Sequence, residues 1–590
     1  MPSIRKKSIP PVRAAAMAGA ACLIVTFLGL TLFARTHELE RGKFTALYQS
    51  VRSDLDLNII NQVTPPDSWL VTQTYNHPTH LDHGVALVWS PFYLLAEEVA
   101  HRTPKARREI FGLGELQVMG IARNAFFIVF VFLLLAQSCA LLASGRAEMS
   151  MGPGKTVLAV LLATPVPWYL WLQPFNTEIT ILFLSAIFIY TLLVLSAQGA
   201  QSKRDYFLIG TFLGVATTTK VSMILLAPAV LAASSYRFSK TVSQKFDKSG
   251  GLRAVTPILI FTGGLFSVLL LLLLNHRVQF GEWILFSHFG LAQHYDYHRD
   301  LVFPMLFGWP NSLLGCSPIF IVTLATVLWK WRTQPHALKI LNFTALAFVV
   351  ILASKLAGLV TYPDELVSRL LVPLIPIIAC QASWVWCNSG RWARGGAVIL
   401  WFGCFAVNWV HIAEFMLHGE LHAGSHYGRS VIGMLSEICQ TAASRLTNLA
   451  ELQKVLEYWP QLLAVFLFAA GMFVLVSAWF KRSWVLFLSA WLGYLLITAL
   501  NLQFNFKNVQ ELAQSGHFKT TVVSRGGGLN HYDEILSVND RAKKFLDSPW
   551  KEVAQAGKER FILQTLDDVE HDPIGFVRDS RNGVFRESRD

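Results

Sequence analysis

The sequence has 590 residues, of which 53% are hydrophobic and 15% are charged, and its mean hydropathy is +0.43. Apolar runs close to the length of a membrane span recur along it, which excludes an ordinary soluble protein and indicates a polytopic membrane protein. The formal net charge of +12 does not indicate a nucleic-acid partner, because the basic residues lie mainly in short clusters between apolar runs, where they set membrane topology.

The first apolar run covers 14–34 and follows a basic start like that of a signal peptide. It is longer than a usual signal core, so we expect an uncleaved first span with a cytoplasmic N-terminus. A polar region follows over 35–118. Twelve further apolar runs complete a prediction of about thirteen transmembrane helices, at 119–143, 156–172, 176–198, 206–219, 221–235, 254–274, 314–329, 340–359, 367–387, 395–413, 460–480 and 484–501.

The charges of the connecting segments support this order of spans. The segments predicted to be cytoplasmic hold twenty Lys and Arg residues against the acids Glu148, Asp205 and Asp247, the bias expected on the inner side of the cytoplasmic membrane. Loops as long as the outer ones are uncommon unless they fold or function. We therefore expect a membrane domain over 1–501 with its chemistry on the extracytoplasmic face. The outer segments are 35–118, 275–313, 414–459 and the C-terminal tail 502–590.

The segment 85–100, "VALVWSPFYLLAEEVA", is apolar but short for a span, and it contains a proline and two glutamates. If it crossed the membrane, every later loop would change sides and the bias of basic residues would invert. We expect a juxtamembrane helix at the outer interface.

Acidic residues gather in the first outer segment. Glu38 and Glu40 follow the first span directly, and Asp54, Asp56 and Asn61 come further along. A carboxylate anchored at the end of a transmembrane helix is well placed to act as a general base, which must lie within hydrogen-bond reach of the proton it accepts. The alternative is a solvated acidic loop.

Two basic residues stand at the predicted outer ends of spans. Lys220 separates two apolar runs so short that it must lie near the bilayer, where a charge normally has a function or reaches the interface. Arg369 opens a later span, and its guanidinium could hold two phosphate oxygens at once. The alternatives are an interfacial turn lysine and a pairing of Arg369 with Asp364 or Glu365.

Histidines mark two outer segments. The stretch 75–84, "YNHPTHLDHG", contains His77, His80 and His83, and 287–300 contains His288 and Tyr295 among further imidazole and phenol groups. These could bind a divalent cation such as Zn²⁺ or Mn²⁺. The spacing of a closed metal site is missing, so we expect no metal site and assign these residues to hydrogen bonds with a sugar or phosphate.

Several motifs occur in the order and spacing of a known family. The first outer segment carries "THELE", "DLDLN" and "SPFYLL". Later segments read "QPFNTEITILFLSAIFIYTLL", "GTFLGVATTTKVSMILLAPA", "FGEWILFSHFG", "FGWPNSLLGCSPIF" and "SRLLVPLIPIIA". Together these resemble the GT-C membrane glycosyltransferases, most closely the protein mannosyltransferase and ArnT-like aminoarabinose transferase group. The chain departs from that group at "THELE", where many relatives have an Asp-Glu pair, at "HPTHLDHG", and in the tail after 502.

The resemblance implies an all-α GT-C fold and an inverting glycosyltransferase. Its donor would be a sugar linked to polyprenyl phosphate, and its acceptor a lipid, a protein or an envelope glycan. It also implies that Lys220 pairs with the lipid phosphate, with Arg369 as a second phosphate ligand. No cofactor follows from it with certainty, although a divalent cation would fit the chemistry.

For the general base we expect Glu38, then Asp56 and then Glu40. Asp54 and Asn61 are assigned to the substrate, with Asp54 also suited to start a helix. The alternative function is a polytopic transporter or lipid flippase of the cell envelope. That class predicts repeated halves with interrupted helices, and no convincing repeat is present in the sequence.

Overall fold

The computed structural model describes residues 11–30, 84–85, 88–94, 115–143, 152–172, 176–198, 203–232, 248–280, 331–356 and 367–418. It also describes short pieces at 306–307, 314, 317–321 and between 433 and 496. These residues contain helices and turns and no strand. The prediction of an all-α protein is therefore confirmed for this part of the chain.

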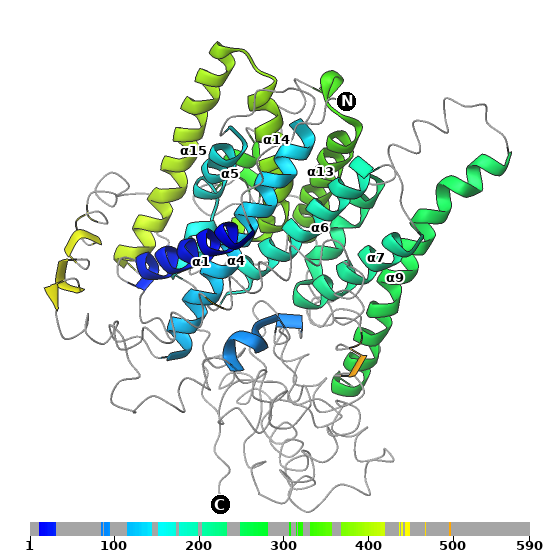
Figure 1. The fold of residues 1–590 in the computed structure, drawn as a ribbon, viewed down its shortest axis with the longest axis horizontal. Helices are drawn as coiled ribbons and strands as arrows, with labels where there is room; N and C mark the ends of the chain where they lie inside the picture. Colours follow the sequence, from blue (N-terminus) through cyan, green and yellow to red (C-terminus); the bar gives the residue numbers. More distant parts are fainter. Residues whose placement is uncertain are drawn as a thin grey trace, which may run out of the picture.

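The α-helices are α1 (Pro11–Leu28), α4 (Glu115–Ala143), α5 (Gly152–Leu162), α6 (Glu178–Gln198), α7 (Lys203–Thr219), α9 (Lys248–Phe280), α13 (His336–Leu356), α14 (Ile375–Cys387) and α15 (Arg391–His418). The π-helix η4 covers Trp168–Leu172. Three 3₁₀ helices are η5 (Val221–Ala229), η8 (Trp331–Thr333) and η9 (Val367–Leu374). Figure 1 shows their arrangement in space.

The chain is an integral, multi-pass membrane protein. Five described helices are long and apolar enough to cross a bilayer, and four shorter apolar helices accompany them. Ten of the thirteen predicted spans coincide with helices of the described part. The other three, over 314–329, 460–480 and 484–501, lie largely outside it.

Two predicted spans differ from the structure in detail. The run 156–172, expected as one helix, is interrupted: α5 ends at Leu162 and a turn precedes η4. Pro165 and Pro167 fall in this interval, and proline removes a backbone donor and clashes with the preceding turn. The run 221–235 begins as η5, a 3₁₀ helix of nine residues, which is long for that geometry.

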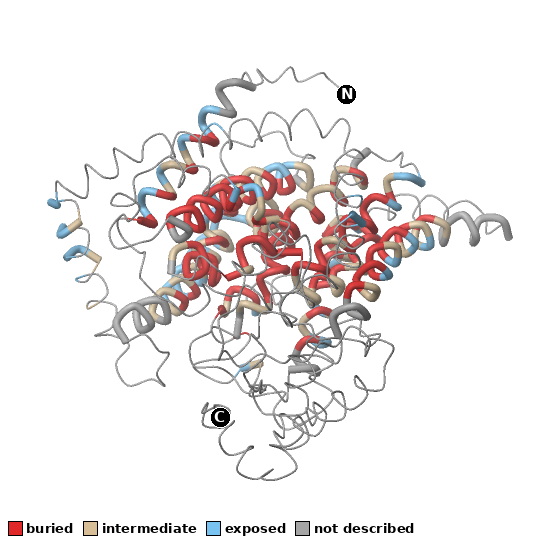
Figure 2. Tube along the Cα trace, turned by 90° about the horizontal axis from the view of Figure 1, so that it is seen from below, coloured by how far each residue is buried: buried red, intermediate tan, exposed pale blue. Residues whose placement is uncertain are grey.

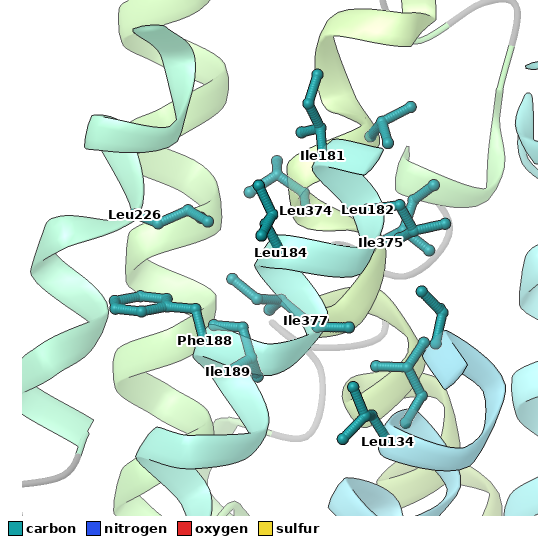
Figure 3. Packing of buried hydrophobic residues seen from close by; sticks show 14 of the residues in the cluster. Leu134, Ile181, Leu182, Leu184, Phe188, Ile189, Leu226, Leu374, Ile375 and Ile377 are labelled. Atoms are coloured by element: carbon teal, nitrogen blue, oxygen red, sulfur yellow. The ribbon is translucent and has the colours of Figure 1, made fainter. Parts of the chain in front are cut away.

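Helix α6 lies at the centre of the bundle. It is apolar on all sides, which favours burial of a helix, and 67% of its span is buried, against 11% for α15 at the edge. Figure 2 shows the buried residues concentrated in the middle of the molecule. In Figure 3 side chains of neighbouring helices meet around α6: Leu226 of η5, Leu134 of α4 and Ile377 of α14.

Helices α7 and α9 lie side by side at another edge of the bundle (Figure 1). Glycines allow their backbones to touch. A Cβ built on Gly264 would meet the carbonyl of Phe207, and one on Gly214 would lie 2.7 Å from the Cβ of Val268. Close packing of small residues is a main source of helix association in membranes, where lipid is as apolar as a leucine side chain.

Polar side chains join other helix pairs. The indole of Trp409 and the amide of Asn408, both on α15, donate to the carbonyls of Leu162 (3.1 Å) and Thr164 (2.7 Å) at the end of α5. Between α13 and α14, the buried Asn342 donates to Gln334 Oε1 (2.6 Å) and accepts from Gln381 Nε2. Each bond satisfies a polar group that would be costly to leave unpaired in an apolar interior.

Candidate functional site

Lys220 occupies a break between two helices. Its backbone is extended, with φ −162° and ψ 124°, between the end of α7 and the start of η5. Its N–H still donates to Ala216 at 3.2 Å, and its carbonyl accepts from Met223 at 3.0 Å. A single residue thus changes the direction of the chain while keeping its backbone bonded.

Three consecutive threonines end α7 before this break. Their hydroxyls donate back to carbonyls of the same helix: Thr217 to Leu213 (2.8 Å), Thr218 to Val215 (2.7 Å) and Thr219 to Ala216 (2.6 Å). The last carbonyls of a helix lack a partner within it, and such hydroxyl bonds compete with regular helix. The three hydroxyls of the "TTTK" sequence are therefore paired where α7 ends in an apolar region.

The ammonium of Lys220 forms an ion pair with Glu178 Oε1, at the first residue of α6. The glutamate side chain is fully buried, whereas 19% of the lysine side chain is exposed. Thr177 Oγ1 donates to the other carboxylate oxygen at 3.2 Å, and the N-terminus of a helix favours a negative charge. Removing one partner of a buried pair costs about 3–5 kcal/mol, because the other charge is left without compensation.

A second polar chain fixes the same end of α6. Thr180 accepts a hydrogen bond of 2.8 Å from the indole N–H of Trp89, and the guanidinium of Arg123 lies 3.5 Å above that indole ring. Arg123 also donates to Asn124, whose amide donates to the carbonyl of Tyr169 at 3.1 Å. The helical piece 88–94, α4, η4 and α6 are thus connected near Glu178.

The described part of the segment 85–100 packs inside the protein. Val85, Trp89, Phe92 and Tyr93 are buried, and Phe92 contacts the rings of Phe126 and Phe127 on α4. Burial against α4 and α6 adds a contact that an interfacial helix does not predict.

Gly84, the last residue of the histidine stretch 75–84, lies against the residues that precede the helix break at Lys220. A Cβ on Gly84 would lie 2.8 Å from the backbone carbonyl carbon of Thr218 and 2.8 Å from the Cγ2 of Thr219. The last residue of the stretch therefore contacts the two residues before Lys220. We refer to Gly84, Glu178, Thr218, Thr219 and Lys220 as the Lys220 site.

Arg369 lies on a neighbouring element. It is half-buried in η9, and η9 packs against both α6 and η5. Arg369 thus lies in η9, Lys220 directly precedes η5, and these two 3₁₀ helices contact each other and share α6 as a neighbour.

The other predicted site residues lie outside the described part of the chain. These are Glu38, Glu40, Asp54, Asp56, Asn61, His77, His80, His83, His288 and Tyr295. Their roles stay predictions. Among the residues that are described, no group of three His, Cys, Asp or Glu side chains could hold a metal ion.

Glu178 is the functional candidate that the sequence analysis missed. It lies in "QPFNTEITILF", a segment noted above for its apolar run. Two signals could have identified it: a carboxylate directly before a span that is otherwise free of charge, and the need of an intramembrane lysine for a counterion.

No protein-family model matches the chain, and no curated protein matches it. Among solved structures, ArnT from Cupriavidus metallidurans in the apo state is similar. The match covers 86% of this chain and 80% of that chain, with 13% sequence identity and a TM-score of 0.40. That solved protein carries the name of the ArnT-like group that the sequence motifs resemble. At this identity and TM-score the likeness assigns no role to any residue of this chain.

Proposed function

We propose that the protein is an inverting glycosyltransferase of the membrane. It would move a sugar from a polyprenyl-phosphate donor to a lipid, protein or envelope-glycan acceptor on the extracytoplasmic face of the cytoplasmic membrane. The observation that carries this proposal is the Lys220 site: a lysine with a buried counterion, at a helix break within the bundle, beside Gly84 at the end of the histidine stretch 75–84. An ionisable residue within a membrane domain marks a functional site by default.

The position of Lys220 suits a lipid-linked phosphate. Its side chain is partly exposed while that of its counterion is buried, and we propose that an anion approaches the lysine from this exposed side. Arg369 on the adjacent η9 supplies a second cation that can bind two phosphate oxygens. A donor held by its lipid tail in the bilayer would present its phosphate at about the depth where these spans end.

The reaction involves one bond formed and one broken. An oxygen or nitrogen of the acceptor attacks the anomeric carbon of the sugar, and its proton passes to a carboxylate, for which we propose Glu38. The bond from the anomeric carbon to the phosphate oxygen breaks, and its electron pair leaves with polyprenyl phosphate. Lys220 and Arg369 stabilise the charge that develops on the leaving phosphate.

Mass spectrometry of whole cells tests the function. Lipid-linked sugars from cells with and without the gene are compared, together with the glycans on lipids, proteins and envelope polymers. We expect one polyprenyl-phosphate sugar to accumulate and one glycan to disappear when the gene is deleted, which would also identify donor and acceptor. Unchanged levels of both classes would contradict the proposal.

Binding of the identified donor to purified protein tests the site. Lys220→Met should raise the Kd about 10- to 100-fold, because a hydrogen bond to a charged group contributes about 1.5–3 kcal/mol. Lys220→Arg should restore part of the affinity. Lys203→Met is the control, because Lys203 is exposed at the far end of the same helix. Equal affinities for Lys220→Met and wild type would remove Lys220 from the site.

A further inference from the structure

We propose that Glu178 limits how tightly Lys220 holds the lipid phosphate, so that polyprenyl phosphate can leave after transfer. This inference rests on the proposed function. It gives the buried carboxylate a role distinct from those of base and phosphate ligand: it is the resident counterion that competes with product.

The two members of the ion pair differ in their exposure to solvent. Glu178 is fully buried, and 19% of the Lys220 side chain is exposed. The carboxylate is held from behind by the hydroxyl of Thr177 and by the N-terminus of α6. Thr177 is itself fixed, because its N–H donates to Asn176 Oδ1 at 2.7 Å and its carbonyl accepts from Ile181 at 2.9 Å. Glu178 thus stays in place when the open side of Lys220 is occupied.

The charges determine the effect on binding. Lys220 and Glu178 together are neutral, so an arriving phosphate meets a cation whose charge is already largely compensated. The donor is a phosphodiester with one negative charge. The product is a phosphomonoester, and such groups carry about −1.5 to −2 at pH 7. A lysine without a counterion would therefore retain product more strongly than it binds donor.

Glu178 offsets this difference because it repels both anions and remains available to Lys220 when the phosphate departs. Because Glu178 stays beside Lys220, the ammonium still has an anionic partner after the phosphate leaves, which avoids the cost of an uncompensated charge. The carboxylate is thus a positioning residue that favours turnover over tight binding.

The experiment measures the Kd of a short-chain polyprenyl phosphate for four full-length proteins: wild type, Glu178→Gln, Lys220→Met and the double variant. Glu178→Gln keeps shape and removes the charge. We expect it to bind the product mimic about tenfold or more tightly than wild type, since charges this close interact strongly away from bulk water. Lys220→Met and the double variant should bind weakly and alike, because the carboxylate acts through the lysine.

Steady-state transfer gives a readout that a merely structural role would not produce. For Glu178→Gln we expect kcat and the KM for donor to fall together, with stronger inhibition by added polyprenyl phosphate. Equal product affinity for wild type and Glu178→Gln would overturn the inference and leave the proposed function standing. Absence of product binding to wild type, with no transfer, would overturn the proposed function itself.

Glu178→Asp guards against loss of folding in the glutamine variant. It keeps the charge and draws it back from Lys220 by one methylene. If Glu178→Gln does not purify as a single species, the aspartate variant should still bind product more tightly than wild type. Unchanged affinity in that variant would overturn the inference.

Discussion

Arg445 Nη1 donates a hydrogen bond of 2.6 Å to the carbonyl of Leu30, so two residues more than 400 positions apart in the sequence are in contact. The segment 35–118 begins a few residues after Leu30. A residue of the segment 414–459 therefore contacts the first predicted span, 14–34.

Cys439 provides a natural reporter for the side of the membrane. It is exposed in the segment 414–459, whereas Cys22, Cys139, Cys380 and Cys404 are buried. We expect a membrane-impermeant maleimide to label Cys439 in intact cells, and Cys439→Ser to lose that label.

The matched control is a cysteine on the predicted cytoplasmic side of the membrane. Trp392 is 93% exposed in the first turn of α15, in a segment predicted to be cytoplasmic. Trp392→Cys in the Cys439→Ser background should react after permeabilisation and not before. The reverse pattern at the two positions would invert the topology and place the Lys220 site on the cytoplasmic face.

Neighbouring glycines of α9 should respond differently to substitution. A Cβ on Gly264 would lie 3.0 Å from both the carbonyl carbon of Phe207 and the N of Thr211, whereas a Cβ on Gly263 would have no atom within 4 Å. Gly264→Ala should lower the stability by about 1–3 kcal/mol because the two backbones must separate. Gly263→Ala should be neutral or slightly stabilising, as alanine favours a helix. Thermal unfolding in detergent compares the two, and equal shifts would show that α7 and α9 are not in close contact.

The indole of Trp89 should stabilise the start of α6. Trp89→Phe keeps a ring beneath Arg123 and removes the donor to Thr180, so the free energy of unfolding should decrease by about 0.5–1.5 kcal/mol. Thr180→Val should cost a similar amount, and the double variant less than the sum, because both changes remove one bond. Strict additivity would mean that the bond does not contribute. Trp392→Phe, at an exposed position, should leave the free energy of unfolding unchanged.

The general base is tested in the first outer segment. Glu38→Gln should nearly abolish transfer while donor binding survives, since loss of a general base typically costs about 10²–10⁴-fold in rate. Glu38→Asp should also be impaired, because the carboxylate moves back by one methylene. Initial rates and donor Kd are measured for both, and for Asp56→Asn and Glu40→Gln. Near wild-type turnover in Glu38→Gln with an inactive Asp56→Asn would assign the base to Asp56.

The fold follows from the sequence to the extent that it depends on local composition. Apolar run length predicted the helices α4 and α6 closely, because a bilayer requires about twenty apolar residues in one helix, whereas α9 extends six residues beyond its predicted span at each end. The same rule treated 156–172 as one span, since hydropathy does not register that Pro165 and Pro167 interrupt a helix. It also could not distinguish the 3₁₀ geometry of η5 from an α-helix, because both bury the same side chains.

The part of the site that local sequence could predict is Lys220. A charge between two short apolar runs is costly near a bilayer, which indicates that it has a function. Its partner Glu178 lies 42 residues earlier in the chain, and nothing in local sequence pairs the two. The contact of Gly84 with Thr218 is likewise a property of packing between distant segments. Long-range pairs of this kind depend on which helices become neighbours, and a single sequence does not encode that in any short pattern.

The buried amides of α13 and α14 bear on how the chain enters the membrane. The two segments emerge from the ribosome one after the other, and the first carries Asn342 within an apolar stretch, 336–352, that is short for a span. Its Nδ2 donates to Gln334, directly before this segment, but its Oδ1 accepts from Gln381 on the second segment, which is synthesised later. An unsatisfied amide is unfavourable in hydrocarbon, so the first segment should wait beside the translocon until the second arrives, and the pair should partition into lipid together.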